Sequence, residues 1–252
     1  MKNRRYVLIS TVVVILLWWI AASIVKDSVT LPSPQETVLA LLEIMASKTF
    51  LLQVFGTLRR AMFGFAIAFG AGLVLGVGAG ISTPLFYLLK PIVLTQRSVP
   101  TMAVILLAII WFGRELAPIL VCVLVIFPII YSAVVNGIRN IDQQLLEMAT
   151  VYHISKRRRL VHLYLPSIRS ALFAVAAAAV SLNLKITIAA EVLSQPGLGI
   201  GTGFQIEKSV VNTAGVIAWA IVAIVLGALL EFLVSPKFVG MVKRSISYKG
   251  SV

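Results

Sequence analysis

The stretch LAPILVCVLVIFPIIYSAVVNG, residues 116–137, decides the fold class of this chain. It carries no charged side chain, and it matches the roughly 20 residues that an α-helix needs to cross a hydrocarbon core about 30 Å thick. Similar apolar runs occur at residues 7–25, 60–81, 97–112, 171–190 and 214–234. We therefore expect an all-α, polytopic membrane protein with about six transmembrane helices.

The composition excludes an ordinary water-soluble domain. Of the 252 residues, 60% are apolar and 12% are charged, whereas soluble domains carry about 25% charged residues. Because apolar runs recur along the whole chain, we expect residues 1–252 to form a single transmembrane domain with its core at about 54–234.

The first apolar run predicts a signal anchor. Residues 7–25 follow three cations, as in a secretory signal peptide, but they exceed the apolar region of about 7 to 15 residues that such peptides have. Trp18 and Trp19 suit a membrane interface. An uncleaved transmembrane segment is therefore the preferred interpretation.

The formal net charge of +13 raises the question of which partner the cations contact. Such a charge on a soluble protein would raise the question of nucleic acid. Here the cations lie between apolar runs, which is typical of cytoplasmic loops and of contact with anionic membrane lipids. We expect no nucleic acid partner.

The distribution of these cations predicts the topology. Six spans place both termini on one side of the membrane, and fifteen of the 22 Lys and Arg residues lie on that side, against six on the other. The excess makes that side the cytoplasm. The fifteen are Lys2, Arg4, Arg5, Lys90, Arg97, Arg139, Lys156, Arg157, Arg158, Arg159, Arg169, Lys237, Lys243, Arg244 and Lys249.

Neither a disulfide nor a metal site is expected. The single cysteine, Cys122, lies in an apolar run and has no partner in the chain. The two histidines, His153 and His162, lack the i, i+3 or i, i+4 spacing of a helical metal pair.

A short helix is predicted between the first two runs, in LPSPQETVLALLEIM. Ser33 is the N-cap, Pro34 opens the helix, and Glu36 completes a capping box. The apolar face could lie on the outer membrane surface or pack on the spans, and we prefer packing. Its members are Val38, Leu41, Leu42 and Met45.

Gly72, Gly76 and Gly80 form two overlapping GxxxG patterns in the second apolar run. Such patterns remove side chains from one helix face and let another backbone approach closely. We expect a packing face, with a helix of the same chain as the favoured partner and a dimer contact as the alternative.

The longest polar stretch, residues 139–170, lies on the predicted cytoplasmic side and contains two short helical patterns. Asn140 or Asp142 can cap the first, and Ser155 can cap the second. The first pattern has an apolar face that needs a partner, because the loop has no core of its own. The members of this face are Leu145, Leu146, Ala149 and Tyr152.

The second helical pattern opens with cations at positions 156–158, which face the positive end of the helix dipole. Attraction to anionic lipid headgroups, worth about 1 kcal/mol per cation, would offset this unfavourable placement. The alternative is a solvated charged face.

This stretch resembles the cytoplasmic signature of permeases from bacterial ATP-binding cassette (ABC) importers. The signature reads Glu-Ala-Ala, three residues, Gly, nine residues, Ile, one residue and Leu-Pro. His153 occupies the place of the glycine, where positive φ is favoured and where histidine adopts such a φ only at a cost. The residues in the signature places, with unchanged spacing, are Glu147, Met148, Ala149, His153, Leu163, Leu165 and Pro166.

Other segments resemble the branch of this family that includes nitrate, taurine, alkanesulfonate and thiamine-precursor permeases. That branch often has a tryptophan shortly before Ala-Ala-Glu, where this chain has Leu184 and Lys185, so the solute stays open. The similar segments are LPSP at 31–34, GFAIAFGAGLVLG at 64–76, KPIVLTQRSVPTMAVILLAIIWFG at 90–113 and AAEVLSQPGLG at 189–199.

The resemblance implies the type I ABC importer permease fold and a transport subunit that is not itself an enzyme. It implies as partners two ATPase subunits, a second permease copy in a homodimer and an extracytoplasmic solute-binding protein. ATP and magnesium would be bound by the ATPase, so this chain needs no cofactor. The loop would form the coupling helix that docks on the ATPase, through Leu145, Leu146, Glu147, Met148, Ala149, Tyr152, His153 and Pro166.

The glycine-rich run QPGLGIGTG, residues 195–203, invites comparison with phosphate-binding loops. It lacks the GK[ST] of a P-loop and falls on the predicted outer side, away from cellular ATP. We expect a flexible external loop near the interface with the binding protein.

Lys185 is the cation predicted to lie well inside a span, where lysine costs roughly 2.5 to 3.5 kcal/mol. Helical side chains lean toward the helix N-terminus, which here points Lys185 deeper into the membrane. We favour a place in the translocation path, where Asn183 and Thr187 would join it and where its charge would suit an anionic solute. A structural ion pair and lipid-facing snorkelling are the alternatives, and Arg97 is a further candidate for the path.

Two rival functions come from other classes. An ion-coupled secondary transporter needs acids or broken helices inside the membrane, whereas Glu191 and Glu231 lie near predicted span ends. A membrane scaffold that moves no solute would leave the signature spacing at 139–170 without a reason. Copurification of an ATPase separates the three functions.

Overall fold

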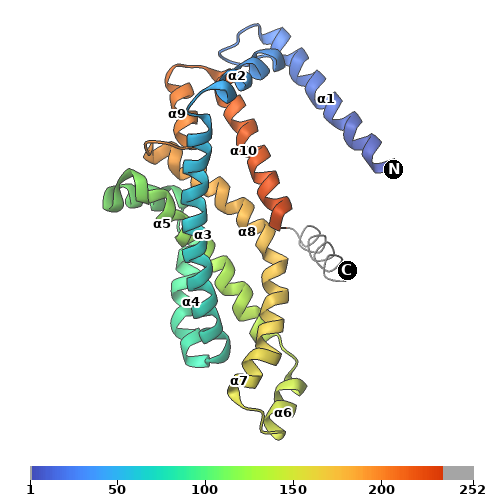
Figure 1. Ribbon diagram of the computed structural model, residues 1–252, viewed down its shortest axis with the longest axis vertical. Coiled ribbons are helices and arrows are strands. Elements are labelled where there is room, and N and C mark those ends of the chain that lie inside the picture. Colours follow the sequence, from blue (N-terminus) through green and yellow to red (C-terminus); the bar gives the residue numbers. More distant parts are fainter. Residues whose placement is uncertain (1, 235–252) are drawn as a thin grey trace, which may run out of the picture.

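The described part of the chain, residues 2–234 of a computed structural model, consists of helices and connecting turns (Figure 1). The cations Lys237, Lys243, Arg244 and Lys249, which entered the topology prediction, lie outside it. The helices are α1 (Lys2–Val25), α2 (Pro34–Ala46), α3 (Phe50–Ile81), α4 (Thr83–Ser98), α5 (Thr101–Arg139), α6 (Gln143–Val151), α7 (Lys156–Arg159), a π-helical turn (Leu160–Tyr164), α8 (Leu165–Ser194), α9 (Ile200–Ser209) and α10 (Thr213–Val234).

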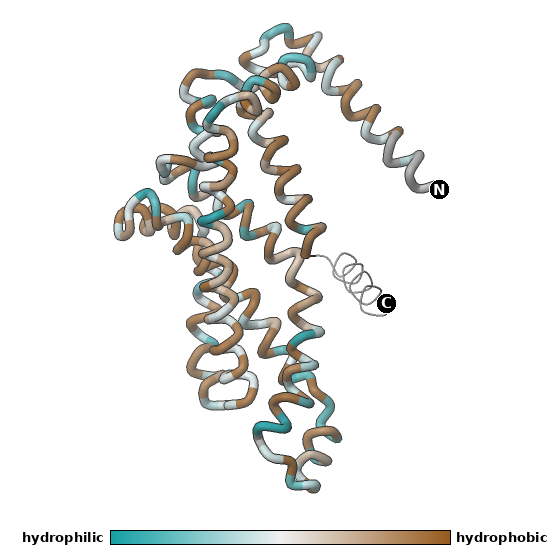
Figure 2. Tube along the Cα trace, in the orientation of Figure 1, coloured by the Kyte–Doolittle hydropathy of each residue, from teal (hydrophilic) through white to brown (hydrophobic). Residues whose placement is uncertain are grey.

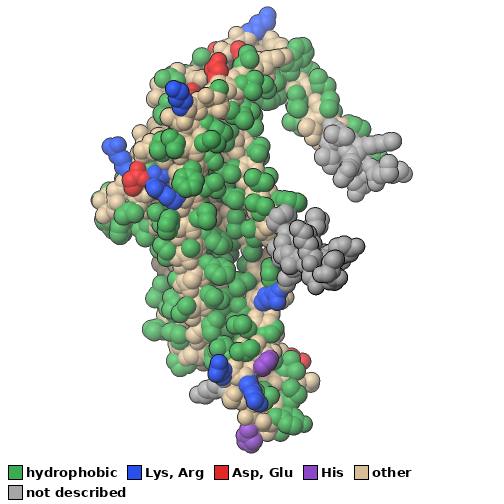
Figure 3. All heavy atoms as spheres, viewed as in Figure 1, with side chains coloured by type: hydrophobic (Ala, Val, Ile, Leu, Met, Phe, Trp, Pro, Cys, Tyr) green, Lys and Arg blue, Asp and Glu red, His purple; other side chains and the backbone are tan. Residues whose placement is uncertain are grey.

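Within the described residues, four helices are long and apolar enough to cross a membrane. They are α3, α5, α10, and α8 together with the turns before it from Arg157. The apolar part of α1, Ile9–Val25, is shorter. Hydrophobic residues run along these helices and hydrophobic side chains cover the visible sides of the bundle (Figures 2 and 3). The chain is a multi-pass membrane protein, and the count of six spans stays a prediction.

Helix α5 contains a sharp break at Gly113, where φ is 72° and ψ is −177°. The two parts pack on each other, because Ile105 and Ala108 share a core cluster with Ala117 and Val121. The chain therefore folds back at the point where the sequence predicted two separate helices. The first part begins at Thr101 rather than at residue 97.

Helix α4 was not predicted. It begins with Pro84 in its first turn, contains Pro91, and carries Lys90 and Arg97, so its sequence shows no long apolar run. Arg97, which the sequence assigned to the cytoplasmic side, occupies the last turn of a 16-residue helix. At 1.5 Å per residue it lies about 21 Å along α4 from Thr83, where the helix begins.

The centre of the bundle is the packing of α3 and α8 on α5. Gly72, Gly76 and Gly80 all face α5, and a Cβ atom at these positions would lie 2.7 to 2.9 Å from the side chains of Ile130, Val134 and Ile138. The GxxxG face is therefore occupied by a helix of the same chain. Small residues bring the two backbones close enough for dense packing.

Helix α2 has the predicted capping box. The Ser33 hydroxyl accepts a hydrogen bond from the Glu36 amide, and the Glu36 carboxylate accepts one from the Ser33 amide at 2.7 Å. The prediction that its apolar face packs on the spans is wrong, because Val38, Leu42 and Met45 are exposed. The helix packs instead through Thr37, Ala40 and Ile44, which leaves the apolar face free for the membrane surface.

Candidate functional site

The predicted coupling helix is α6, at the end of the molecule opposite α2 (Figure 1). Asp142 caps it, accepting a hydrogen bond from the Gln144 amide at 2.9 Å. The predicted apolar face is split between two surroundings: Ala149 is buried and Leu146 half-buried, whereas Leu145 and Tyr152 are exposed. Met148 and Glu147 are exposed as well, so α6 presents a mixed apolar and acidic surface.

His153 adopts the backbone conformation that the signature glycine favours. Its φ is 51°, in the left-handed region. The His153 amide donates to the Thr150 carbonyl and the Ile154 amide donates to the Ala149 carbonyl, each at 3.0 Å. These two bonds form a Schellman motif that ends α6. The turn expected of the signature glycine therefore forms with histidine at position 153.

Arg159 fixes this turn against the following helix. Its Nε donates to the Ile154 carbonyl at 3.0 Å and its Nη2 to the Ala149 carbonyl at 2.8 Å. The Ser155 hydroxyl accepts a bond from the Arg158 amide at 3.5 Å, as predicted for a cap. One cation of the basic run therefore binds the loop itself.

Pro166, the last residue of the signature, lies in the first turn of α8 and is exposed. It lines an apolar groove between α3 and α8, together with Phe69, Leu73 and Phe173. In the sequence, Pro166 is separated from α6. It lies at the start of α8, the long helix that carries the path candidates Asn183, Lys185 and Thr187.

Asn183 and Thr187 do not share a face with Lys185. Both are buried: Asn183 Nδ2 donates to the Ala61 carbonyl at 2.9 Å, and the Thr187 hydroxyl lies 2.8 Å from Cys122 Sγ. The expectation that the three polar groups line one cavity is wrong. Residues 183 and 187 are one helical turn apart, whereas residue 185 points to the other side of α8.

Lys185 is exposed in a groove between α8 and α10. Glu231 of α10 lines the same groove and accepts a hydrogen bond from Ser181 at 2.8 Å. No ion pair joins Lys185 to Glu231 within the described residues. Lys185 therefore shares the groove with a carboxylate, on a helix that is long and apolar enough to span a membrane.

Arg97 lies where α4 meets α5. Its Nη2 donates to the Pro128 carbonyl at 3.1 Å and to the Ser132 hydroxyl at 2.6 Å. The side chain lines a cavity with Gln96 and Thr101, at the break between the two helices. A cation with spare donors at a helix break is suited to an anion.

The sequence analysis missed a buried group of ion-paired side chains. Arg60 of α3 is 2% exposed and forms ion pairs with Glu191 of α8 at 3.0 Å and with Glu115 of α5. Glu191 is fully buried and also accepts a bond from the Thr57 hydroxyl at 2.7 Å. We call these four side chains, Thr57, Arg60, Glu115 and Glu191, the ionic network. It joins three helices of the bundle.

The ionic network also holds the glycine-rich run. Arg60 Nη1 donates to the Leu198 carbonyl at 2.6 Å, the Gly201 amide donates to Glu191 at 3.1 Å, and the Gly197 amide donates to Glu115 at 2.8 Å. The expected flexible loop is therefore a tightly bonded one. The sequence analysis counted Arg60 at the start of the 60–81 run without assigning it a role, although an arginine at the start of an apolar run and a distant Ala-Ala-Glu were signals for a pair.

In the described part of the chain, no group of three or more His, Cys, Asp or Glu side chains is arranged to hold a metal ion. The carboxylates of the ionic network accept hydrogen bonds from donors of the protein itself. Helix α6 presents an exposed surface rather than a cavity.

Comparison with known proteins identifies the family of the chain. Residues 68–235 match the model of the family described as the binding-protein-dependent transport system inner membrane component.

Individual relatives agree with this match. A protein of Escherichia coli (strain K12) named as an aliphatic sulfonates transport permease, SsuC, is 35% identical over 202 residues, which cover 79% of this chain and 74% of that protein. Nitrate import permease protein NrtB of Leptolyngbya laminosa is 29% identical over 191 residues, covering 73% and 67%. The match to an SsuC of Bacillus subtilis (strain 168), 33% identical over 144 residues, spans 57% of this chain and 52% of that protein.

The fold has a solved counterpart. A chain of the MetNI methionine ABC transporter superposes with a TM-score of 0.64, covering 74% of this chain and 93% of the other. The sequences are 18% identical, so the likeness concerns the fold.

Proposed function

Because this chain belongs to the family of binding-protein-dependent transport system inner membrane components, we propose that it is the permease subunit of an ABC importer. It forms the translocation path for a small solute that a binding protein delivers. The names of its relatives, which include nitrate and aliphatic sulfonate permeases, support an anionic solute.

The observation that carries the proposal is the exposed surface of α6. Leu145, Met148 and Tyr152 leave apolar area in water, and Glu147 adds a charge beside them. Exposed apolar patches rimmed by polar groups mark protein contacts. A separate ATPase that binds ATP and magnesium docks on this surface, and this chain performs no covalent chemistry.

The proposed mechanism is alternating access. ATP closes a pair of ATPase subunits, the α6 helices of two permease copies move with them, and the path opens toward the loaded binding protein. The Schellman turn and the Arg159 contacts fix α6 to the start of α8. A displacement of α6 is thereby passed to the helix that carries Lys185.

Two cations favour an anionic solute in the path. Lys185 is exposed in the groove between α8 and α10, and Arg97 lines the cavity at the α4–α5 break. A positive charge at membrane depth lowers the free energy of an anion there. Asn183 and Thr187 position α8 against α3 and α5 rather than touch the solute.

An ion-coupled secondary transporter is the alternative, and Glu191 is the observation in its favour because it is a buried acid inside a span. Its oxygens already accept bonds from Arg60, Thr57 and Gly201. A carboxylate held by three donors is suited to structure rather than to a proton relay. Copurification of an ATPase with the tagged chain supports the importer, and a transport-active chain without one contradicts it.

Uptake by a Lys185→Met variant tests the path. The complex should still assemble and hydrolyse ATP, while uptake of the anionic solute falls at least about tenfold, which corresponds to about 1.4 kcal/mol. Glu231→Gln is the control on the other wall of the groove and should change uptake less. Unchanged affinity and rate in Lys185→Met would remove this lysine from the path.

The proposed orientation has both termini in the cytoplasm. Cysteine accessibility scanning in a Cys122→Ser background tests it. Position 157 should react only with reagent added from the cytoplasmic side. Position 39, which is exposed and lies beside the buried Ala40, should react only from outside. Labelling of position 157 from outside would overturn the orientation.

A further inference from the structure

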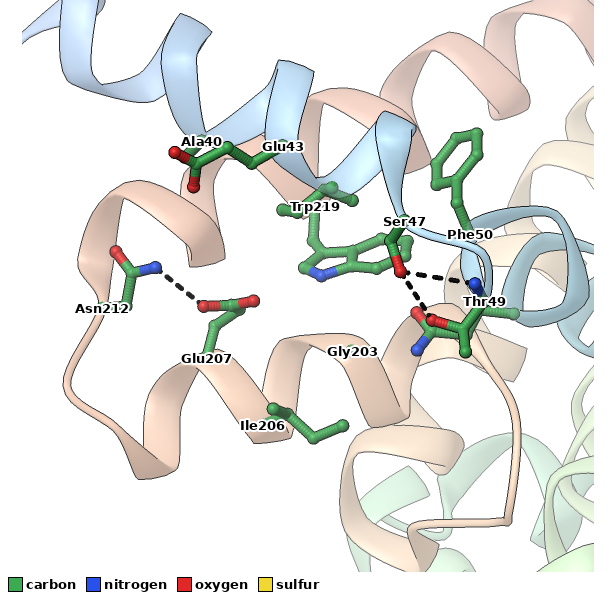
Figure 4. Close-up of a pocket in the computed structure, with 12 residues that line it drawn as sticks. Ala40, Glu43, Ser47, Thr49, Phe50, Gly203, Ile206, Glu207, Asn212 and Trp219 are labelled. Carbon is green, nitrogen blue, oxygen red and sulfur yellow. Dashed lines mark hydrogen bonds between the residues drawn. The ribbon is translucent and has the colours of Figure 1, made fainter.

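A second cavity (Figure 4) lies at the end of the molecule that carries α2 and α9, opposite α6 (Figure 1). It measures about 320 Å³ and is enclosed by α2, the start of α3, α9 and α10. Glu43 of α2 lies above the cavity and Glu207 of α9 below it, with the indole of Trp219 to the right of both carboxylates (Figure 4). Neither the coupling helix nor the Lys185 groove contributes to it.

The walls of this cavity are shaped by glycines. A Cβ atom on Gly203 would lie 2.5 Å from Cε2 of Trp219, so only a glycine lets the indole sit against α9. A Cβ atom on Gly215 would lie 2.5 Å from Oε2 of Glu207, the oxygen that accepts a bond from Asn212 at 2.8 Å. Trp219 also packs on Phe50, with 6.0 Å between ring centroids. The aromatic wall and one carboxylate are thus held in fixed positions.

The charged groups among the described residues that line the cavity are two carboxylates, and none is a lysine or arginine. Glu207 already accepts a bond from Asn212, whereas no hydrogen bond to Glu43 is made within residues 2–234. Gln53 lines it too, and its Oε1 atom is buried with no hydrogen-bond partner in the described structure. Trp219 is 3% exposed, and the Nε1 edge of its indole borders the cavity (Figure 4). A buried polar atom left without a partner is costly.

We propose that this cavity binds a primary alkylammonium group with an acceptor oxygen a few atoms away. Such a group has three N–H donors, which match Glu43, Glu207 and Gln53 Oε1. Its charge is favoured by two carboxylates and by aromatic rings close by. The acceptor oxygen takes the indole N–H. A bare metal ion fits less well, because aromatic rings supply no ligand atoms for it.

Two sources carry this chemistry. A free aminoethyl solute could pause here near the mouth of the importer, and an ethanolamine lipid headgroup could enter from the outer leaflet. Both present an ammonium two carbons from an oxygen-bearing group. The inference stands apart from the proposed function, because it concerns binding at the outer end and makes no use of ATP.

Binding to the full-length chain in phosphatidylglycerol nanodiscs tests the proposal. The probes are 2-aminoethanesulfonate and phosphoethanolamine, with ethanesulfonate as the matched compound that lacks the amine. We expect calorimetric binding of the two amines and none of ethanesulfonate. Glu43→Gln and Glu207→Gln should each weaken amine binding at least tenfold, whereas Glu147→Gln, the same change at the opposite end, should not.

The lipid source is tested by native mass spectrometry after reconstitution with mixed phosphatidylethanolamine and phosphatidylglycerol. Selective retention of the ethanolamine lipid, lost in both cavity variants, assigns the site to the headgroup. Amine binding without such retention assigns it to a free solute. Should Glu207→Gln fail to fold, the exposed Glu43 still provides the test. Absence of both signals, equal binding of ethanesulfonate, or amine binding unchanged in Glu43→Gln overturns the proposal.

Discussion

The two ends of the molecule treat their polar and apolar groups in opposite ways. Toward the end that carries α2 and α9, Arg60 and Glu191 are charged side chains in a membrane helix bundle, and both are buried with partners from the same chain. At the α6 end, Tyr152 and Met148 are apolar or aromatic side chains that stay exposed, Tyr152 to 75%. At the first end, the charged side chains are paired within the chain. At the α6 end, the apolar side chains stay exposed and can be buried only by a partner.

This difference separates what holds the fold from what performs the transport. A buried ion pair that is complete within one chain fixes helices relative to each other, and losing one member leaves an uncompensated charge. An exposed apolar surface contributes nothing to the isolated chain and gains free energy only on docking. Substitutions at the two ends should therefore fail in different measurements, stability at one and coupling at the other.

The largest effect is expected from Arg60→Met. It leaves Glu191 buried without its cation, which costs about 3 to 5 kcal/mol. Thermal unfolding in detergent should show a large loss of stability or no folded protein. Arg59→Met, at an exposed neighbouring position, is the control and should unfold near the parent temperature. Equal stability of the two variants would mean that the ionic network does not hold the fold.

A smaller loss is expected from Gly201→Ala at the same end. The new Cβ would lie 2.4 Å from Glu191 Cβ and 2.6 Å from the Ile188 carbonyl oxygen. Such overpacking costs about 1 to 3 kcal/mol. Gly70→Ala, where nothing lies within 4 Å of the added atom, should be neutral or stabilising in the same unfolding assay. A neutral Gly201→Ala would show that the glycine-rich run can move away from the ionic network.

At the α6 end, Glu147→Arg should leave unfolding unchanged and reduce uptake at least about tenfold, or roughly 1.4 kcal/mol in coupling. The reason is a reversed charge on the surface that we propose docks on the ATPase. Substrate-stimulated ATPase activity and uptake are measured together, with Glu36→Gln as a carboxylate change at the opposite end. If both activities stay at the parent level, this residue does not take part in docking.

The smallest effect is expected at His153. Glycine removes the strain of the left-handed conformation but gives the unfolded chain more freedom, so His153→Gly should change stability by less than about 1 kcal/mol. His153→Val should lose about 1 to 2 kcal/mol, because a β-branched residue resists positive φ. Hydrogen exchange of the 149–154 amides compares the two. Faster exchange in the glycine variant than in the valine variant would contradict the role of the turn.

The sequence predicts the local devices of the fold well. The capping box of α2 and the N-caps of α6 and α7 depend on neighbouring residues, so their patterns are visible in a short window. The sequence analysis did not predict helix α4, because two prolines and two cations interrupt its apolar pattern.

The ionic network could not be read from local pattern. Its pairs join residues 55 and 131 positions apart, and only the tertiary packing of α3, α5 and α8 brings them together. The same limit explains why the sequence wrongly placed Asn183 and Thr187 in one cavity with Lys185. Sequence spacing gives the angle between Asn183 and Lys185 on α8, but which face meets another helix is decided by the bundle.

The separation of the Arg60 partners along the chain also sets an order for biosynthesis. At about 5 to 20 residues per second, Arg60 leaves the ribosome roughly 7 to 26 s before Glu191, which is 131 residues later. Glu115 follows after only 55 residues, or roughly 3 to 11 s. We expect the nascent α3 to pair with Glu115 first, so that this half-exposed carboxylate shields the arginine from lipid until the second half of the protein has been inserted.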